Sequence, residues 1–177
     1  MTGKLDEYRH EARKLYDRGS YDMAQKLFLP LAESGDAESQ YYLGETLLLR
    51  VYDYENAIAW WRKAADQGHA GAQSNLGYML TAGLGVETNH AEAIRLFRLA
   101  AQKGNAEAQY NLGAMYDLGM SVRQDREEAA VWFARRPGTG WNRPRRSSAI
   151  CTPMARASRG TSARPWTSTG KPPRRAK

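Results

Sequence analysis

The sequence repeats itself with a period of about 36 residues, and this period constrains the fold more than any other feature. A segment that begins at Ala72 aligns with one that begins at Ala108, and an earlier segment aligns at a spacing of 33 residues once a shorter loop is allowed. A more divergent unit opens the chain. We expect four units over residues 1–136, at approximately 5–35, 36–70, 71–106 and 107–136. A Leu-Gly pair marks three of them: Leu43-Gly44, Leu76-Gly77 and Leu112-Gly113.

Each unit has the pattern of two helices. Apolar residues recur at helical spacing in the second half of a unit, which gives one apolar stripe per helix. Asn89 with Glu92, and Asp125 with Glu128, have the N-cap spacing of a capping box. Glycine at a helix end takes the left-handed conformation without strain. We therefore expect the second helices to end at Gly35, Gly68 and Gly104.

The glycine of each Leu-Gly pair lies inside the first helix, where it costs about 1 kcal/mol relative to alanine. Its recurrence predicts that a neighbouring helix approaches closely at that point. The small residues at matching positions of the second helices are the expected partners: Ala57, Ala93 and Ala129.

One helix pair cannot bury both of its faces, so the units must stack. We expect an all-α fold, a right-handed α-solenoid of antiparallel helix pairs with the first helices on the concave side. The pattern AxxxLGxxYxxGxGVxxDxxxAxxWFxKAAxxGxxxA over residues 8–136 resembles the Sel-one-like repeats, a branch of the tetratricopeptide superfamily. The match departs at Ser121, which stands where the second glycine of the loop is expected, and the unit at Ala37 lacks that loop.

Charge divides the chain into two parts. Residues 1–136 contain 16 of the 26 Lys and Arg and all 19 Asp and Glu, whereas residues 137–177 contain ten basic residues and no acidic one. The tail is rich in Arg, Ser, Gly and Pro, which predicts disorder. The only cysteine, Cys151, lies there, so the repeats have no disulfide and no Cys-ligated metal. No apolar run is long enough for a membrane span and no signal peptide opens the chain, so we expect a cytoplasmic protein.

The tail has a second interpretation at the codon level. The repeat pattern stops within a helix at about Arg136, and loss of one nucleotide near Arg135 would allow the other frame to encode a further repeat in phase. Met154-Ala155, for example, then gives only a glycine codon. We hypothesise that residues 137–177 are an out-of-frame translation. The alternative is a nucleic-acid-binding arm, in which Arg143, Arg145 and their neighbours contact phosphates and Trp141 and Trp166 stack on bases.

No catalytic constellation or cofactor motif occurs in the sequence. His10, His69 and His90 lie in different units and are interpreted as solvated or capping residues. The glycines of Gly83-Leu84-Gly85-Val86 join two helices and are interpreted as a tight turn. We therefore expect no enzyme activity, no cofactor and no metal.

Polar residues next to the Leu-Gly pairs are the candidates for partner binding, because first helices in such stacks line the groove. An amide there could bond the backbone of a peptide. The other interpretation is that these residues bond neighbouring helices or face water. The candidates are Gln40, Tyr42, Gln73, Asn75, Gln109 and Asn111. The large aromatic residues are better explained by core packing than by binding: Trp60, Trp61, Phe97, Trp132 and Phe133.

The resemblance implies a non-enzymatic scaffold or adaptor that binds a protein or peptide partner, often in bacteria. Nucleic-acid binding through the tail is the alternative function. A solenoid also needs a polar helix to cover its last unit, and the sequence after Val131, Trp132 and Phe133 supplies none. We expect a frayed C-terminal end that can self-associate.

Overall fold

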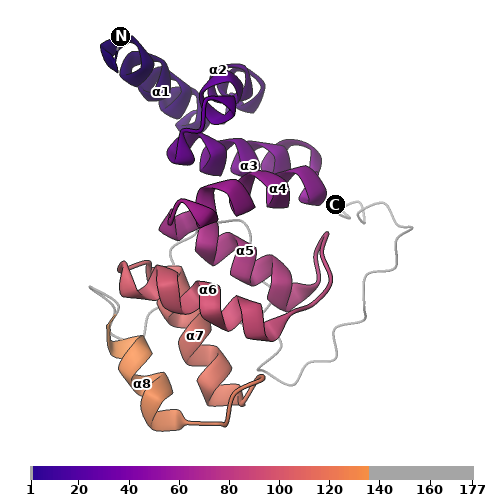
Figure 1. Ribbon diagram of the computed structural model, residues 1–177, viewed down its shortest axis with the longest axis vertical. Helices are drawn as coiled ribbons and strands as arrows, with labels where there is room; N and C mark the ends of the chain where they lie inside the picture. Colours follow the sequence, from indigo (N-terminus) through magenta and orange to yellow (C-terminus); the bar gives the residue numbers. More distant parts are fainter. Residues whose placement is uncertain (1, 136–177) are drawn as a thin grey trace, which may run out of the picture. The chain divides into compact units, whose positions relative to one another are not determined.

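A computed structural model describes residues 2–135, with side chains from Leu5 onward, and contains eight helices and no strand in that part of the chain (Figure 1). The predicted tail, 137–177, lies outside the described residues. The helices are α1 (Thr2–Asp17), α2 (Tyr21–Glu33), α3 (Ala37–Val51), α4 (Tyr54–Asp66), α5 (Ala70–Ala82), α6 (His90–Gln102), α7 (Ala106–Leu118) and α8 (Arg126–Ala134).

The helices pack as successive pairs, which confirms the expected solenoid of antiparallel hairpins. Each first helix packs on the second helix of its own pair, and α3, α5 and α7 also pack on the second helix of the preceding pair. The first helices α5 and α7 also contact each other. The core is therefore continuous along the stack, and α5 is buried on all sides from Ala72 to Thr81.

Polar caps define where the helices begin. The Asn89 side chain accepts a hydrogen bond from the Glu92 N–H, and the Asp125 side chain accepts one from the Glu128 N–H, as predicted. In a complete capping box the Glu92 side chain would accept a hydrogen bond from the Asn89 N–H, but here that N–H bonds a neighbouring helix. The Asn89 N–H donates to the Leu80 carbonyl at 2.9 Å, which ties the start of α6 to α5.

Left-handed backbone ends the second helices at the three glycines that the sequence indicated, with φ of +99°, +83° and +83° at Gly35, Gly68 and Gly104. The serine that replaces a loop glycine adopts the same conformation, since φ is +54° at Ser121. A side chain there is strained by about 1 kcal/mol or more. Where the loop is missing, Tyr52 takes φ +55° and the next residue, Asp53, caps α4.

The partners of the first-helix glycines are aromatic rings, which corrects the expectation that alanines face them. A Cβ added at Gly44 would lie 2.5 Å from Trp61 Nε1, and one at Gly77 would lie 2.9 Å from Phe97. The Trp61 indole is held there because its Nε1 donates to the Tyr41 carbonyl at 3.2 Å. Because a ring needs the space, the close approach is between helix backbone and side chain. The alanines at the matching positions are buried nearby in the core: Ala57, Ala93 and Ala129.

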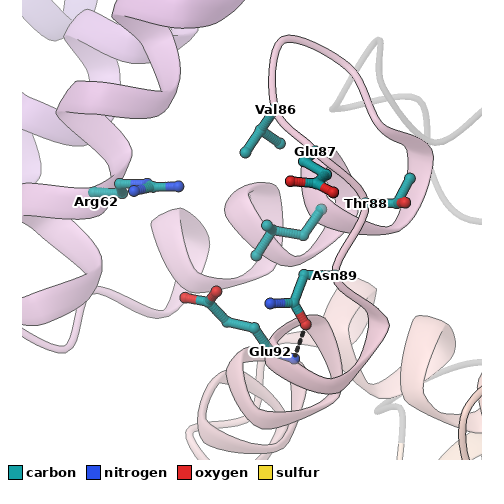
Figure 2. Close-up of a pocket in the computed structure, with 7 residues that line it drawn as sticks. Arg62, Val86, Glu87, Thr88, Asn89 and Glu92 are labelled. Atoms are coloured by element: carbon teal, nitrogen blue, oxygen red, sulfur yellow. Dashed lines mark hydrogen bonds between the residues drawn. The ribbon is translucent and has the colours of Figure 1, made fainter.

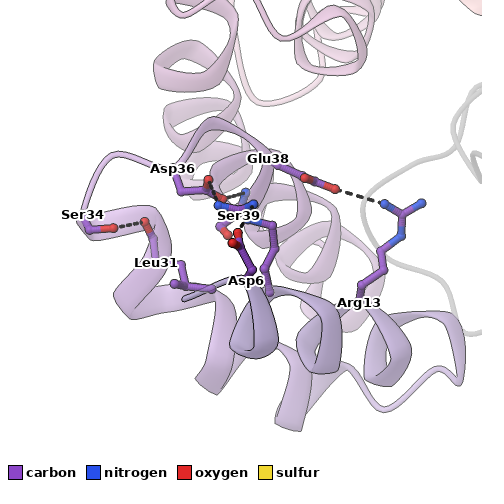
Figure 3. A network of polar contacts seen from close by, with 8 residues as sticks. Asp6, Arg13, Leu31, Ser34, Asp36, Glu38 and Ser39 are labelled. Atoms are coloured by element: carbon purple, nitrogen blue, oxygen red, sulfur yellow. Dashed lines mark hydrogen bonds and ion pairs between the residues drawn. The ribbon is translucent and has the colours of Figure 1, made fainter. Parts of the chain in front are cut away.

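Ion pairs attach the first helix pair to the rest of the stack (Figure 3). Arg9 of α1 donates to Asp36 at 2.7 Å, and Arg13 donates to Glu38 at 3.1 Å. On the other side, Arg50 of α3 pairs with Asp22 of α2. These side chains are 21–70% exposed, so each pair adds at most about 1 kcal/mol.

Candidate functional site

The three glutamines predicted to bind a partner bond neighbouring helices in this structure. The Nε2 of Gln40 donates to the Ala32 carbonyl at 3.0 Å, and the next two units repeat this bond at 3.1 Å. In each unit the acceptor lies eight residues earlier, near the end of the preceding second helix, and the glutamine is 4% exposed. The structure thus gives the glutamines the structural role that the sequence left open. The repeated pairs are Gln40–Ala32, Gln73–Ala65 and Gln109–Ala101.

Two of the remaining candidates, Tyr42 and Asn75, belong to a polar and aromatic cluster that joins the first helices α1, α3 and α5. At its centre Glu45 is only 3% exposed. Its carboxylate accepts a hydrogen bond from Asn75 Nδ2 at 2.5 Å and one from Tyr16 Oη at 3.2 Å. Asn75 is therefore a partner of Glu45 inside the stack, while Asn111 is buried one unit farther along.

Tyr42 lies at the edge of this cluster and remains half-buried. Its ring stacks on Phe28 with centroids 5.3 Å apart and meets the edge of Tyr16 at 5.0 Å. The Arg13 guanidinium lies over the ring, 4.6 Å from its centroid, while it also bonds Glu38. Among the six candidates, Tyr42 is the one that combines partial exposure with aromatic and charged neighbours.

Burial dominates the electrostatics of the cluster. It raises the pKa of Glu45 from 4.5 to about 7, although the hydrogen bonds from Tyr16 and Asn75 act in the opposite direction. Burial, with Arg13 opposing it, also raises the pKa of Tyr42 to about 12. The pKa values of Tyr16 and Tyr41 lie above the usual range, first because of burial and then because of the Glu45 carboxylate. The cluster therefore combines one acid that titrates near neutral pH with phenols that stay protonated.

One feature of the sequence distinguishes Glu45 from the equivalent residues of the other units. An acidic residue directly follows the buried Leu-Gly pair, on the stripe that also carries Tyr42. The equivalent positions in the next two units are Tyr78 and Ala114, so Glu45 does not belong to the repeat pattern. A departure of this kind in a buried stripe marks a residue with a role particular to its unit.

The three histidines do not converge on a site. His69 caps α5, since its Nδ1 accepts a hydrogen bond from the Ala72 N–H at 3.2 Å. Burial lowers its pKa, in keeping with a neutral ring that accepts this bond. His10 is exposed and His90 is half-buried at the start of α6. In the described part of the chain no three His, Cys, Asp or Glu side chains gather where they could hold a metal ion.

The predicted core role of the aromatic residues holds for the three that are almost fully buried, Trp61, Phe97 and Trp132. The other two, Trp60 and Phe133, are half-buried. Lys63 lies over the Trp60 ring at 3.9 Å from its centroid. Among residues 2–135, no helix is both long and apolar enough to cross a bilayer.

The helix pairs correspond to a known repeat. The Sel1 repeat model matches residues 37–69, 70–105 and 106–135, three consecutive units that contain α3 to α8. The chain belongs to the Sel1 repeat family. Sel1 repeat proteins are in general protein-interaction scaffolds and are typically non-catalytic. The first pair, α1 and α2, lies outside the three matched units and extends the stack at its N-terminal end.

Two solved structures share this architecture. A Sel1 repeat protein from Oxalobacter formigenes is 30% identical with a TM-score of 0.66, and the match covers 74% of this chain and 55% of that one. A protective antigen of uropathogenic Escherichia coli strains with an SLR fold is 27% identical with a TM-score of 0.69, over 76% of this chain and 30% of that one. The chain thus spans about half and about a third of the lengths of these two Sel1-type proteins. No curated protein matches the sequence.

Proposed function

We propose that this chain is an interaction scaffold that binds a partner protein through the surface of its helix stack. The observation that carries the proposal is a contrast between framework and surface positions. Framework residues recur in every matched unit, as the glutamine-to-carbonyl bond and the glycine beneath an aromatic ring illustrate. Surface positions change their chemistry from unit to unit, as exposed Glu87 and its equivalent 36 residues later, exposed Arg123, illustrate. A repeat that keeps its framework and varies its surface is suited to recognise a partner.

The surface next to Tyr42 is the best-supported contact region. It presents a half-buried aromatic ring beside Arg13 and Glu38, whose side chains are 47% and 43% exposed. Aromatic and arginine side chains contribute strongly to protein interfaces. A partner that covered this surface would also shield the Arg13–Glu38 pair from water. We propose Tyr42 as the partner-binding residue of the predicted set, and the three glutamines as the residues that hold its support.

A cross-linking experiment tests this assignment in the full chain. A photo-reactive amino acid replaces Glu38, at the start of α3, and in a matched variant it replaces Glu55, at the start of α4. Both positions are first-turn glutamates, and the Glu38 variant differs in that it also loses the exposed ion pair with Arg13, which adds at most about 1 kcal/mol. We expect cross-linked partner protein from Glu38 in extracts of the source cells and much less from Glu55. Equal yields from both positions, or none from either, would refute the contact region.

A further inference from the structure

An open cavity of about 410 Å³ lies between the second and third helix pairs (Figure 2). Its apolar part is formed by Leu80 of α5 and by Val86 in the following loop. The charged side chains of Arg62, Glu87 and Glu92 converge on it from α4, the loop and the first turn of α6 (Figure 2). Within residues 5–135, neither Arg62 nor Glu87 has an ion-pair partner within 4.0 Å. Both keep their bonding capacity for another molecule.

The next unit provides an internal comparison, because its equivalent residues lie 36 positions later. There Arg98 takes the place of Arg62, and its Nη2 donates to the Tyr116 hydroxyl at 2.5 Å. The place of Glu92 is taken by Glu128, whose Oε1 accepts a hydrogen bond from Trp132 Nε1 at 2.7 Å. At this equivalent place each of the two charged groups is therefore hydrogen-bonded to an aromatic side chain.

Both aromatic residues are leucines in the unit that holds the cavity. Leu80 stands where Tyr116 stands one unit later, and Leu96 stands where Trp132 stands. Leucine is shorter than these residues and carries no hydrogen-bonding group. Arg62 thus lacks the phenol that Arg98 has, and Glu92 has only a long contact of 4.0 Å with Arg95. The cavity is the space beside two charged groups that have lost their aromatic partners.

We propose that this cavity binds a tyrosine side chain of a partner protein, an inference that rests on the scaffold function proposed above. The ring lies against Leu80 and Val86, as the Tyr116 ring lies beside Arg98 one unit later. A phenolic hydroxyl both accepts and donates a hydrogen bond. It accepts from the Arg62 guanidinium and donates to the carboxylate of Glu87 or Glu92, so both kinds of charge are satisfied. Tyrosine is also among the residues that most often anchor protein interfaces.

The charge around the cavity selects among tyrosine-containing partners. Glu87 is replaced by Arg123 in the next unit, so two carboxylates flank the cavity here where one flanks the equivalent place. A phosphorylated tyrosine is repelled by these carboxylates. Lysine or arginine next to the tyrosine in the partner sequence strengthens binding, because those charges lie near Glu87 and Glu92.

Nuclear magnetic resonance of the full, nitrogen-15-labelled chain tests the site with N-acetyl-L-tyrosinamide as the probe. We expect saturable shifts of the Arg62 Nε–H signal and of the backbone amides of residues 86–92. The equivalent Arg98 signal serves as an internal control and stays unchanged. N-acetyl-L-phenylalaninamide, which lacks the hydroxyl, binds roughly tenfold more weakly because the charged groups are left unpaired. Absence of saturable shifts at Arg62, or equal binding of the two probes, overturns the proposal.

Two variants exclude an indirect effect. Leu80→Tyr supplies the phenol from within the chain, and we expect it to abolish probe binding. Because Leu80 is only 2% exposed, this variant can disturb folding, so Arg62→Gln on the exposed surface provides a second test. We expect Arg62→Gln to weaken binding at least tenfold with an unchanged circular dichroism spectrum. Undiminished binding in a folded Arg62→Gln variant sinks the proposal. Failure of the probe leaves the cross-linking result at Glu38 intact, so the two proposals fail separately.

Discussion

Replacing Glu45 by glutamine removes the buried charge of the first-helix cluster while it keeps the shape of the side chain. The amide oxygen still accepts from Asn75, and the Tyr16 hydroxyl can rotate to accept from the new amide group. The pKa of Glu45 is raised from 4.5 to about 7 in the folded chain. At pH 8 the folded chain must ionise a buried acid that ionises readily when unfolded, which lowers the free energy of unfolding by ~3 kcal/mol.

The direction of the pH effect follows from which state binds the proton more tightly. The folded state does, so Glu45 contributes most favourably below pH 4.5, and its contribution is lost as the pH rises through 7. Glutamine does not titrate. The free energy of unfolding of Glu45→Gln relative to the original chain should therefore increase by roughly 2–3 kcal/mol between pH 5 and pH 8.

Urea denaturation followed by circular dichroism at several pH values measures this difference. Glu55→Gln, which changes an exposed glutamate at the start of α4, is the matched control and should show no such trend. If the free energies of unfolding of Glu45→Gln and of the original chain depend on pH in the same way, burial does not raise the pKa of Glu45 as described. Such a result would mean that water reaches the Glu45 carboxylate in the folded state.

Four further predictions concern the framework and the end of the stack. Gly44→Ala should lower the free energy of unfolding by about 1–3 kcal/mol, because the clash of a Cβ 2.5 Å from the buried Trp61 ring outweighs the gain in helix propensity. Gly113→Ala should lower it less, because Phe133 is half-buried and can move. Equal losses of stability in thermal melts of the two variants would contradict this. Gln73→Leu should cost about 0.5–1.5 kcal/mol by removing one of the two hydrogen bonds to the Ala65 carbonyl, which keeps its bond from the Gly68 N–H, and exposed Gln102→Leu is the neutral control in the same melts. Amide hydrogen exchange should be faster in α8 than in α6, since α8 has nine residues and Val131 is 45% exposed; equal protection would argue against an uncovered end. Nucleotide sequencing across codons 130–140 should show that the alternative frame encodes a further repeat, and a frame that does not would remove the frameshift hypothesis.

The periodic part of the molecule could be predicted from the sequence because the same packing positions recur in three units. The Leu-Gly pairs, the caps at Asn89 and Asp125 and the glycine helix ends follow from local rules that repetition makes reliable. The identity of the atoms that meet was harder to predict. The glycines indicated a close approach, but an aromatic side chain can reach from one turn along the partner helix, so Trp61 fills the space where an alanine was expected.

Features that occur once could not be predicted in the same way. The hydrogen bond between Glu45 and Asn75 joins residues 30 positions apart and has no equivalent in the next unit. The cavity beside Arg62 depends on the absence of a tyrosine, which becomes visible only when Leu80 is compared with Tyr116 in space. Repetition therefore predicts the framework, while departures from it locate both candidate sites.

The bond from each glutamine to a main-chain carbonyl does not depend on which side chain the acceptor residue carries. Deletion of residues 70–105 would join two equivalent positions and place Gln109 eight residues after Ala65, the spacing that every junction already uses. This bond is thus kept when whole units are removed, duplicated or exchanged, although other helix faces then pack at the junction. The length of such a chain, and with it the number of surfaces that it displays, can change by recombination at the turns while this hydrogen bond is preserved at every junction.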